Sequence, residues 1–186
     1  EDVRTRQTFD YQKQLLSEIH KWQSAPAMGV RGQATATICE NSGETHCVPV
    51  GCPTLFISRS LNLGQTLNTK WQRVLTKLKR GEPLNLVFTL PAFSPATKVP
   101  LQLKHRDALG ISLSNMAKGA KSSFWIQQMS YDRLNLQKWE REHGFKADLR
   151  TYHSVEDWTR DIAADTDLVI STRIHGGMAG VAAEIP

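Results

Sequence analysis

The spacing of apolar residues divides the chain into helical and extended segments. Apolar positions that recur every three or four residues indicate amphipathic helices, and short apolar runs rich in β-branched residues indicate buried strands. The helical spacing predicts helices over residues 8–23, 33–40, 66–80, 101–118, 131–144, 154–165 and 176–184. The strand pattern covers residues 27–32, 84–90, 122–128, 147–152 and 167–172, whereas segment 46–56, with its prolines and glycine, predicts a loop or a short irregular strand.

The order of these segments predicts the fold class. From residue 84 onward, strands alternate with helices, which is typical of parallel strands in a layered α/β domain. We therefore predict two Rossmann-like α/β units with parallel sheets, each present only in part. Residues 1–60 would form the end of an N-terminal domain, residues 61–83 a connecting segment, and residues 84–186 a C-terminal domain that lacks its last elements.

The turn after the last predicted strand brings charged and small residues to one edge of the sheet. In DLVISTRIHGG, Arg173 and His175 follow the strand, and Gly176 and Gly177 open the next predicted helix. Ligands of open parallel sheets bind beyond the carboxyl ends of the strands, and a helix N-terminus favours anions. Arginine adds a forked cationic donor, and histidine a side chain that carries a proton near neutral pH. This turn is therefore predicted to be an anion site.

A second turn of similar design lies near the start of the chain. Arg31 and Gly32 end the strand predicted over residues 27–32, and a helix follows directly. We predict that the two edges face each other across a cleft and hold an anionic ligand. The predicted ligand-binding residues are Arg31, Gly32, Ser171, Thr172, Gly176 and Gly177, with Arg173 and His175 as the catalytic pair. The same residue order also fits a purely structural turn, in which the arginine caps carbonyl groups and the histidine packs on the sheet.

Composition and charge narrow the class of protein. The chain has 186 residues, 40% of them hydrophobic, and a net charge of +5, which is typical of a globular protein. The sequence has no apolar run of about 18 residues that would predict a membrane span, and it lacks the basic stripe or module typical of nucleic-acid binding. The cysteines Cys39, Cys47 and Cys52 are odd in number and irregularly spaced, which predicts free thiols in a reducing compartment and no metal site.

Three segments resemble the polysaccharide pyruvyl transferase family. The segment ADTDLVISTRIHGGMAGVAAEIP is similar to that family's C-terminal motif, in which an apolar strand precedes Ser-x-Arg-apolar-His-Gly and a small-residue helix ends in apolar-Pro. VRGQAT and GCPTLF resemble the family's mid-chain signature at the end of its first domain. The resemblance extends from about Val30 to Pro186, and RIHG is its most specific part.

The resemblance implies two Rossmann-like domains in a GT-B-like arrangement, with the ligand between them. It also implies transfer of pyruvate from phosphoenolpyruvate onto sugar hydroxyls of a glycan or its precursor, free or lipid-linked, as a ketal that bridges two hydroxyls. Phosphoenolpyruvate is then a co-substrate, and no cofactor or metal is required. Arg173 and Arg31 would hold its anionic groups, and His175 would act as general acid or as a phosphate ligand. Asp165 and Asp167 precede the strand and are predicted to be structural.

The sequence is also compatible with two other functions. A nucleotide-sugar glycosyltransferase of the same architecture would use the same strand edges, and a non-catalytic carbohydrate- or anion-binding domain would keep the fold without the chemistry. Members of the resembled family normally begin with more of a first domain and continue past the apolar-Pro step, so the chain is expected to be part of a longer protein. The expected location is the cytoplasm, with membrane association through the acceptor, or the Golgi in a eukaryote.

Overall fold

The computed structural model describes residues 3–22, 27–41, 43, 47–90 and 100–186. Residue 23, the last of the first predicted helix, and residue 46, the first of the predicted loop, lie outside the described residues. The chain forms two compact units, Glu1–Leu55 and Phe56–Pro186. The division falls after Leu55 rather than after residue 60, and residues 61–83 belong to the same unit as residues 84–186.

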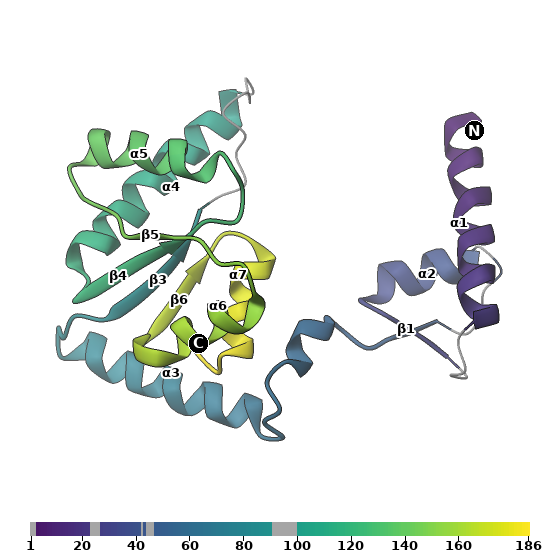
Figure 1. Cartoon of the computed structure of the whole chain (residues 1–186), viewed down its shortest axis with the longest axis horizontal. Helices are drawn as coiled ribbons and strands as arrows, with labels where there is room; N and C mark the ends of the chain where they lie inside the picture. Colours follow the sequence, from purple (N-terminus) through teal and green to yellow (C-terminus); the bar gives the residue numbers. More distant parts are fainter. Residues whose placement is uncertain (1–2, 23–26, 42, 44–46, 91–99) are drawn as a thin grey trace. The chain divides into compact units, whose positions relative to one another are not determined.

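The C-terminal unit is built on a four-stranded parallel sheet in the order β5-β4-β3-β6. Its strands are β3 (Asn85–Thr89), β4 (Ser122–Ile126), β5 (Leu149–Arg150) and β6 (Leu168–Ser171). The chain runs from β3 through β4 to β5 and then crosses to β6 on the other side of β3 (Figure 1). The predicted parallel α/β fold is therefore confirmed for this unit. The reversal between β3 and β6 is the kind of position at which open parallel sheets bind ligands.

Helices cover both faces of this sheet, and strand β3 is therefore buried along its whole length. The helices are α3 (Leu63–Lys79), α4 (Pro100–Gly119), α5 (Asp132–His143), α6 (Val155–Asp165) and α7 (Ile174–Ala182). On one face α3, α4 and α5 pack against Phe88 and Trp125, whose rings stack at 4.6 Å between centroids. On the other face α6 and α7 pack against Val87 and Ile126. Val74 of α3 lies in the first of these cores, so the segment predicted to connect two domains contributes to the C-terminal core.

Two helix ends are fixed by local interactions. Gly144 follows α5 in the left-handed conformation, with φ of 61°, which costs glycine little because it has no Cβ. Ser154 precedes α6, and its hydroxyl accepts a hydrogen bond from the amide of Asp157 at 3.0 Å. Both signals act within a few residues, which is why the sequence alone predicts them.

The N-terminal unit contains a small parallel sheet. Its elements are α1 (Val3–Trp22), β1 (Met28–Val30), α2 (Gln33–Asn41), β2 (Cys47–Pro49) and the 3₁₀ helix η1 (Pro53–Phe56), which ends at the start of the next unit. Strand β1 pairs with β2 in parallel, and α2 packs on the pair through Ala36 and Cys39. The GT-B-like arrangement of the two units stays a prediction.

The prediction of three free thiols is wrong. Cys39 of α2 and Cys47 of β2 form a disulfide, and Cys52 is the remaining free thiol. The Cα atoms of the bonded pair lie 6.2 Å apart, inside the range of about 4.4–6.8 Å that a disulfide spans. An odd cysteine count does not prevent two of the residues from pairing once the fold places them together. The inference of a reducing compartment therefore loses its basis.

The disulfide predicts a specific thiol count. Titration of the denatured protein without reductant should find one reactive thiol, that of Cys52, and three after reduction. Reduction should also destabilise the N-terminal unit by about 2–4 kcal/mol, because the bond limits the unfolded chain. Three thiols in the unreduced protein would show that Cys39 and Cys47 do not pair in solution.

None of the helices in the described part of the chain is long and apolar enough to cross a membrane.

Candidate active site

The carboxyl ends of β3 and β6 lie side by side at the reversal of the sheet. Thr89 and Ser171 end these strands and are partners in the register. Their hydroxyl oxygens are 2.7 Å apart. The two strands therefore end at the same point on the sheet edge, the kind of position at which open parallel sheets bind ligands.

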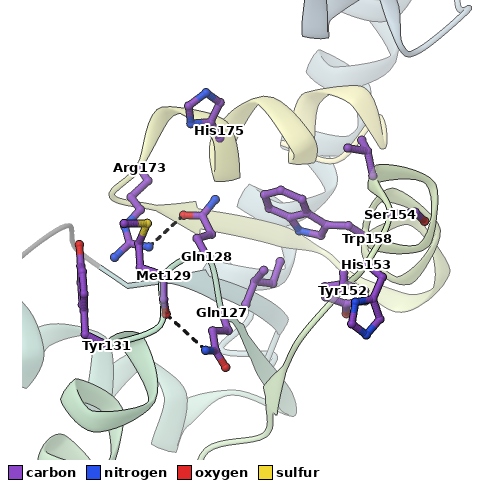
Figure 2. Close-up of a pocket in the computed structure, with 12 residues that line it drawn as sticks. Gln127, Gln128, Met129, Tyr131, Tyr152, His153, Ser154, Trp158, Arg173 and His175 are labelled. Carbon is purple, nitrogen blue, oxygen red and sulfur yellow. Dashed lines mark hydrogen bonds between the residues drawn. The ribbon is translucent and has the colours of Figure 1, made fainter.

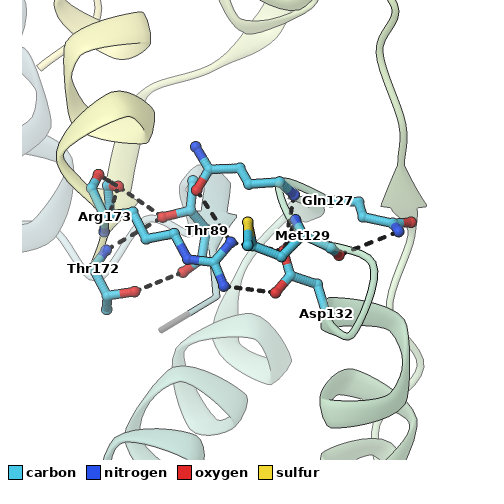
Figure 3. A network of polar contacts seen from close by, with 8 residues as sticks. Thr89, Gln127, Met129, Asp132, Thr172 and Arg173 are labelled. Carbon is cyan, nitrogen blue, oxygen red and sulfur yellow. Dashed lines mark hydrogen bonds and ion pairs between the residues drawn. The ribbon is translucent and has the colours of Figure 1, made fainter. Parts of the chain in front are cut away.

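Hydroxyl groups hold the turn that follows β6. The Ser171 hydroxyl donates to the carbonyl of Arg173 at 2.5 Å and accepts from its amide at 3.2 Å. The Thr172 hydroxyl donates to the carbonyl of Thr89 at 3.3 Å. Figure 3 shows this network around Thr89, Thr172 and Arg173. Ser171 and Thr172, predicted as substrate contacts, thus use their hydroxyls to fix the turn, and their contact with a substrate stays a prediction.

Helix α7 begins at Ile174, two positions before the predicted start. The amides of Gly176 and Gly177 donate to the carbonyl of Arg173 at 3.1 and 3.2 Å. The helix starts earlier than predicted and uses these two amides within its first turn. A contact between the two glycines and a substrate anion stays a prediction. The amides without an intrahelical acceptor in such a turn are the earlier ones, those of Ile174 and His175. The helix end and its dipole remain at the sheet edge.

Gly176 has a packing role instead. It is buried, and a Cβ placed on it would lie 2.3 Å from Cγ2 of Thr89 and 2.5 Å from Oγ of Ser171. A Cβ on Gly177 would meet Ser171 only at 3.7 Å, an ordinary contact. The first turn of α7 thus approaches the strand ends closely because residue 176 has no side chain.

The guanidinium group of Arg173 is bound by a carboxylate that the sequence analysis missed. Its two terminal nitrogens donate to Asp132 at 2.8 and 2.6 Å (Figure 3). One of them also lies 3.5 Å from Oε1 of Gln128 (Figure 2). The side chain of Arg173 is 9% exposed and that of Asp132 is fully buried. A signal was present, because an aspartate in the first turn of a helix after a predicted strand also lies at the carboxyl edge. A direct contact between Arg173 and a substrate anion stays a prediction.

His175 is exposed and lies on the first turn of α7, beside a cavity of about 470 Å³. The cavity lies next to the carboxyl end of β4, and Figure 2 shows the side chains around it. Its wall is mostly aromatic, amide and apolar. The residues that line it are Ile126, Gln127, Gln128, Met129, Tyr131, Tyr152, His153, Ser154, Val155, Trp158, Arg173 and His175. None of these described residues is a carboxylate or a lysine.

Tyr152 is a donor rather than a base in this cavity. Its hydroxyl donates to Oδ2 of Asp161 at 2.8 Å. Burial, and then the hydrogen bond to Asp161, raise the pKa of Tyr152 to about 12. The phenol therefore stays protonated near neutral pH and does not serve as the base that removes a proton from a sugar hydroxyl.

The two carboxylates that precede β6 lie at the opposite edge of the sheet. Asp165 accepts from the side-chain amide of Asn85 at 3.0 Å, and Asp167 accepts from the Asn85 backbone amide at 2.9 Å. Asp167 also pairs with Lys77 at 2.6 Å. Partial burial alone would raise the pKa of Asp167, but the hydrogen bonds from Lys77 and Asn85 outweigh it and lower that pKa below its ordinary value. Both aspartates tie the amino ends of β3 and β6 together, which agrees with the structural role predicted for them.

Arg31 and Gly32 belong to the N-terminal unit. Arg31 is exposed and directly follows β1. The carbonyl of Gly32 accepts from the amides of Thr35 and Ala36, both at 3.1 Å, and so opens α2. The predicted order of strand, arginine, glycine and helix is therefore confirmed. A ligand shared with the residues of the C-terminal unit stays a prediction.

Metal binding has no candidate site in the part of the chain that the structure describes. No group of three or more histidine, cysteine, aspartate or glutamate side chains there could hold a metal ion.

The fold and the site define a parallel α/β unit with a histidine and an arginine at the reversal of its sheet. A model of the polysaccharide pyruvyl transferase family matches residues 19–186. The chain belongs to this family, as the resemblance predicted. The family indicates pyruvyl transferase activity and a glycan acceptor, and it does not favour the glycosyltransferase or non-catalytic alternatives. No curated protein and no solved structure matches the chain.

Proposed function

We propose that this protein transfers pyruvate from phosphoenolpyruvate onto two hydroxyls of a sugar and releases inorganic phosphate. The observation that carries the proposal is the position of His175. It lies on the first turn of α7, next to Arg173 and beside the cavity. Phosphoenolpyruvate needs donors for a phosphate and a carboxylate, and a helix N-terminus with a neighbouring arginine suits both groups.

The proposed reaction begins with protonation of the methylene carbon of phosphoenolpyruvate by His175. This step leaves a cationic centre at C2, which the first sugar hydroxyl attacks as it loses its proton. Phosphate then leaves C2 with the bonding electrons, and the second hydroxyl attacks to close the ketal. The two hydroxyls release two protons. One restores the proton that His175 gave to the methyl group, and the leaving phosphate takes the other. In this proposal the amides of Ile174 and His175, in the first turn of α7, stabilise the phosphate as it leaves.

The cavity suits the acceptor rather than the donor. Apart from Arg173 and the histidines its wall is uncharged, and it carries the rings of Tyr131, Tyr152 and Trp158 beside the amides of Gln127 and Gln128. Aromatic rings pack against the apolar face of a sugar, and a few placed polar groups fix its hydroxyls. A sugar held there would have its hydroxyls within reach of the turn that carries His175.

Incubation of the full-length protein with phosphoenolpyruvate and a galactose- or mannose-type acceptor tests the proposal. Phosphate should be released only when the acceptor is present. The product should be heavier than the acceptor by one pyruvate less one water. A parallel incubation with nucleotide-sugar donors serves as the control. Sugar transfer from those donors, without phosphate release from phosphoenolpyruvate, would contradict the proposal.

A further inference from the structure

The carboxylate of Asp132 is fully buried and fully engaged. Asp132 is the first residue of α5. Its Oδ2 accepts from the amides of Gln128 and Met129, at 2.8 and 2.9 Å, in the loop that follows β4. The same carboxylate binds both terminal nitrogens of Arg173, at 2.8 and 2.6 Å. It is therefore fixed by the protein backbone on one side and holds the arginine on the other.

A buried ion pair is weak evidence for stability, because two charges lose their hydration when they are buried. The geometry of the pair shows instead how the two side chains orient each other. A carboxylate and a guanidinium that meet through two hydrogen bonds fix each other in orientation as well as in position. The pair links the loop after β4 to the turn after β6, across the central strand of the sheet.

Arg173 is held at both ends. Its backbone amide and carbonyl bind the hydroxyl of Ser171, and the carbonyl also accepts from the first turn of α7. Its side chain is bound by Asp132. His175 follows two positions later on the same turn. Any shift of the Arg173 side chain that moves its backbone therefore also moves His175.

We propose that Asp132 is a positioning residue for pyruvyl transfer. Its carboxylate holds Arg173 in one orientation, so that the turn presents His175 to the substrate. This inference rests on the proposed function. In this proposal Asp132 does not contact the substrate, because its carboxylate is buried and all of its partners described above belong to the protein.

Replacement of Asp132 with asparagine tests the proposal. The amide cannot accept from all four donors, so Asp132→Asn should lower kcat/KM for phosphoenolpyruvate by about 10–100-fold through misplacement of the turn. In an Arg173→Ala background the same change should alter kcat/KM by less than about twofold, since the residue through which it acts is gone.

Asp132→Asn should lower Tm in the wild-type background and raise it in the Arg173→Ala background, where it removes an unpaired buried charge.

Asp167→Asn is the matched control. Asp167 also accepts from a backbone amide and pairs with a cation, but at the opposite edge of the sheet. This variant should lower Tm and leave kcat/KM unchanged. NMR signals of the His175 imidazole should move in Asp132→Asn and stay in place in Asp167→Asn. A merely structural role of Asp132 would lower Tm without moving those signals.

Equal losses of kcat/KM in Asp132→Asn and Asp167→Asn would overturn the proposal. Losses of kcat/KM from Asp132→Asn and Arg173→Ala that simply multiply in the double variant would overturn it as well. Absence of acceptor-dependent phosphate release from the wild-type protein would refute the proposed function instead. The His175 signals would then still decide the role of Asp132, and unchanged signals would overturn it. Should Asp132→Asn not fold, Arg173→Lys must move the same signals, because lysine keeps the charge but loses the fork.

Discussion

Replacement of His175 with alanine should lower the turnover of pyruvyl transfer by about 10²–10⁴-fold, the usual contribution of a general acid. The affinity for phosphoenolpyruvate should change much less, because Arg173 and the first-turn amides of α7 remain. His175→Gln should be almost as slow, since the glutamine amide can donate a hydrogen bond but cannot deliver a proton. The measurement is acceptor-dependent phosphate release from the full-length protein at saturating donor.

His143→Ala is the control for this experiment. His143 lies in the last turn of α5 and does not line the cavity. Its replacement should leave turnover unchanged. If His175→Gln instead retains most of the wild-type turnover and chiefly raises KM, His175 holds phosphate and does not transfer a proton. Wild-type rates and affinities in His175→Ala would refute the site assignment and leave RIHG as a structural turn.

Replacement of Gly176 with alanine should destabilise the C-terminal unit by about 3 kcal/mol, at the upper end of the usual cost of overpacking. The new Cβ would lie 2.3 Å from Thr89 and 2.5 Å from Ser171, so the first turn of α7 must move away from the strand ends. Turnover should fall as well, because His175 moves with that turn. Denaturant unfolding, together with the phosphate-release assay, measures both effects.

Gly177→Ala is the matched control. Its Cβ would make only an ordinary contact with Ser171, at 3.7 Å, and alanine stabilises a helix by about 0.5–1 kcal/mol relative to glycine. The variant should therefore unfold at the wild-type denaturant concentration or slightly above it. Equal midpoints for Gly176→Ala and Gly177→Ala would mean that the close approach of α7 to the strand ends is absent in solution.

Sequence patterns predicted most of the secondary structure, because helix and strand periods are local. The apolar runs of β3, β4 and β6 and the helix ends at Gly144 and Ser154 depend on residues only a few positions apart. The start of α7 was harder to predict, because Ile174 and His175 carry no helix signal of their own. The helix begins there because the carbonyl of Arg173 accepts from the amides of Gly176 and Gly177, and Ser171 holds the backbone of Arg173.

The disulfide between Cys39 and Cys47 could not be predicted from local sequence patterns. The spacing of the cysteines does not reveal that α2 lies against the β1–β2 pair. Only that packing brings the two Cα atoms to 6.2 Å. Cysteine count alone therefore gives no basis for an inference about the redox environment.

The sequence by itself determined that Arg173 and His175 lie at the carboxyl edge of a parallel sheet, since an apolar strand, a charged turn and a helix in that order admit no other edge. The resemblance of RIHG and its flanking segments also predicted the family, which the family model over residues 19–186 confirms. The tertiary structure decided what these residues meet. Asp132 and Arg173 are 41 positions apart in the chain, and they pair because β4 and β6 flank β3. Strand order is a property of the whole sheet, so no local pattern could specify that contact or the close fit of Gly176 against Thr89.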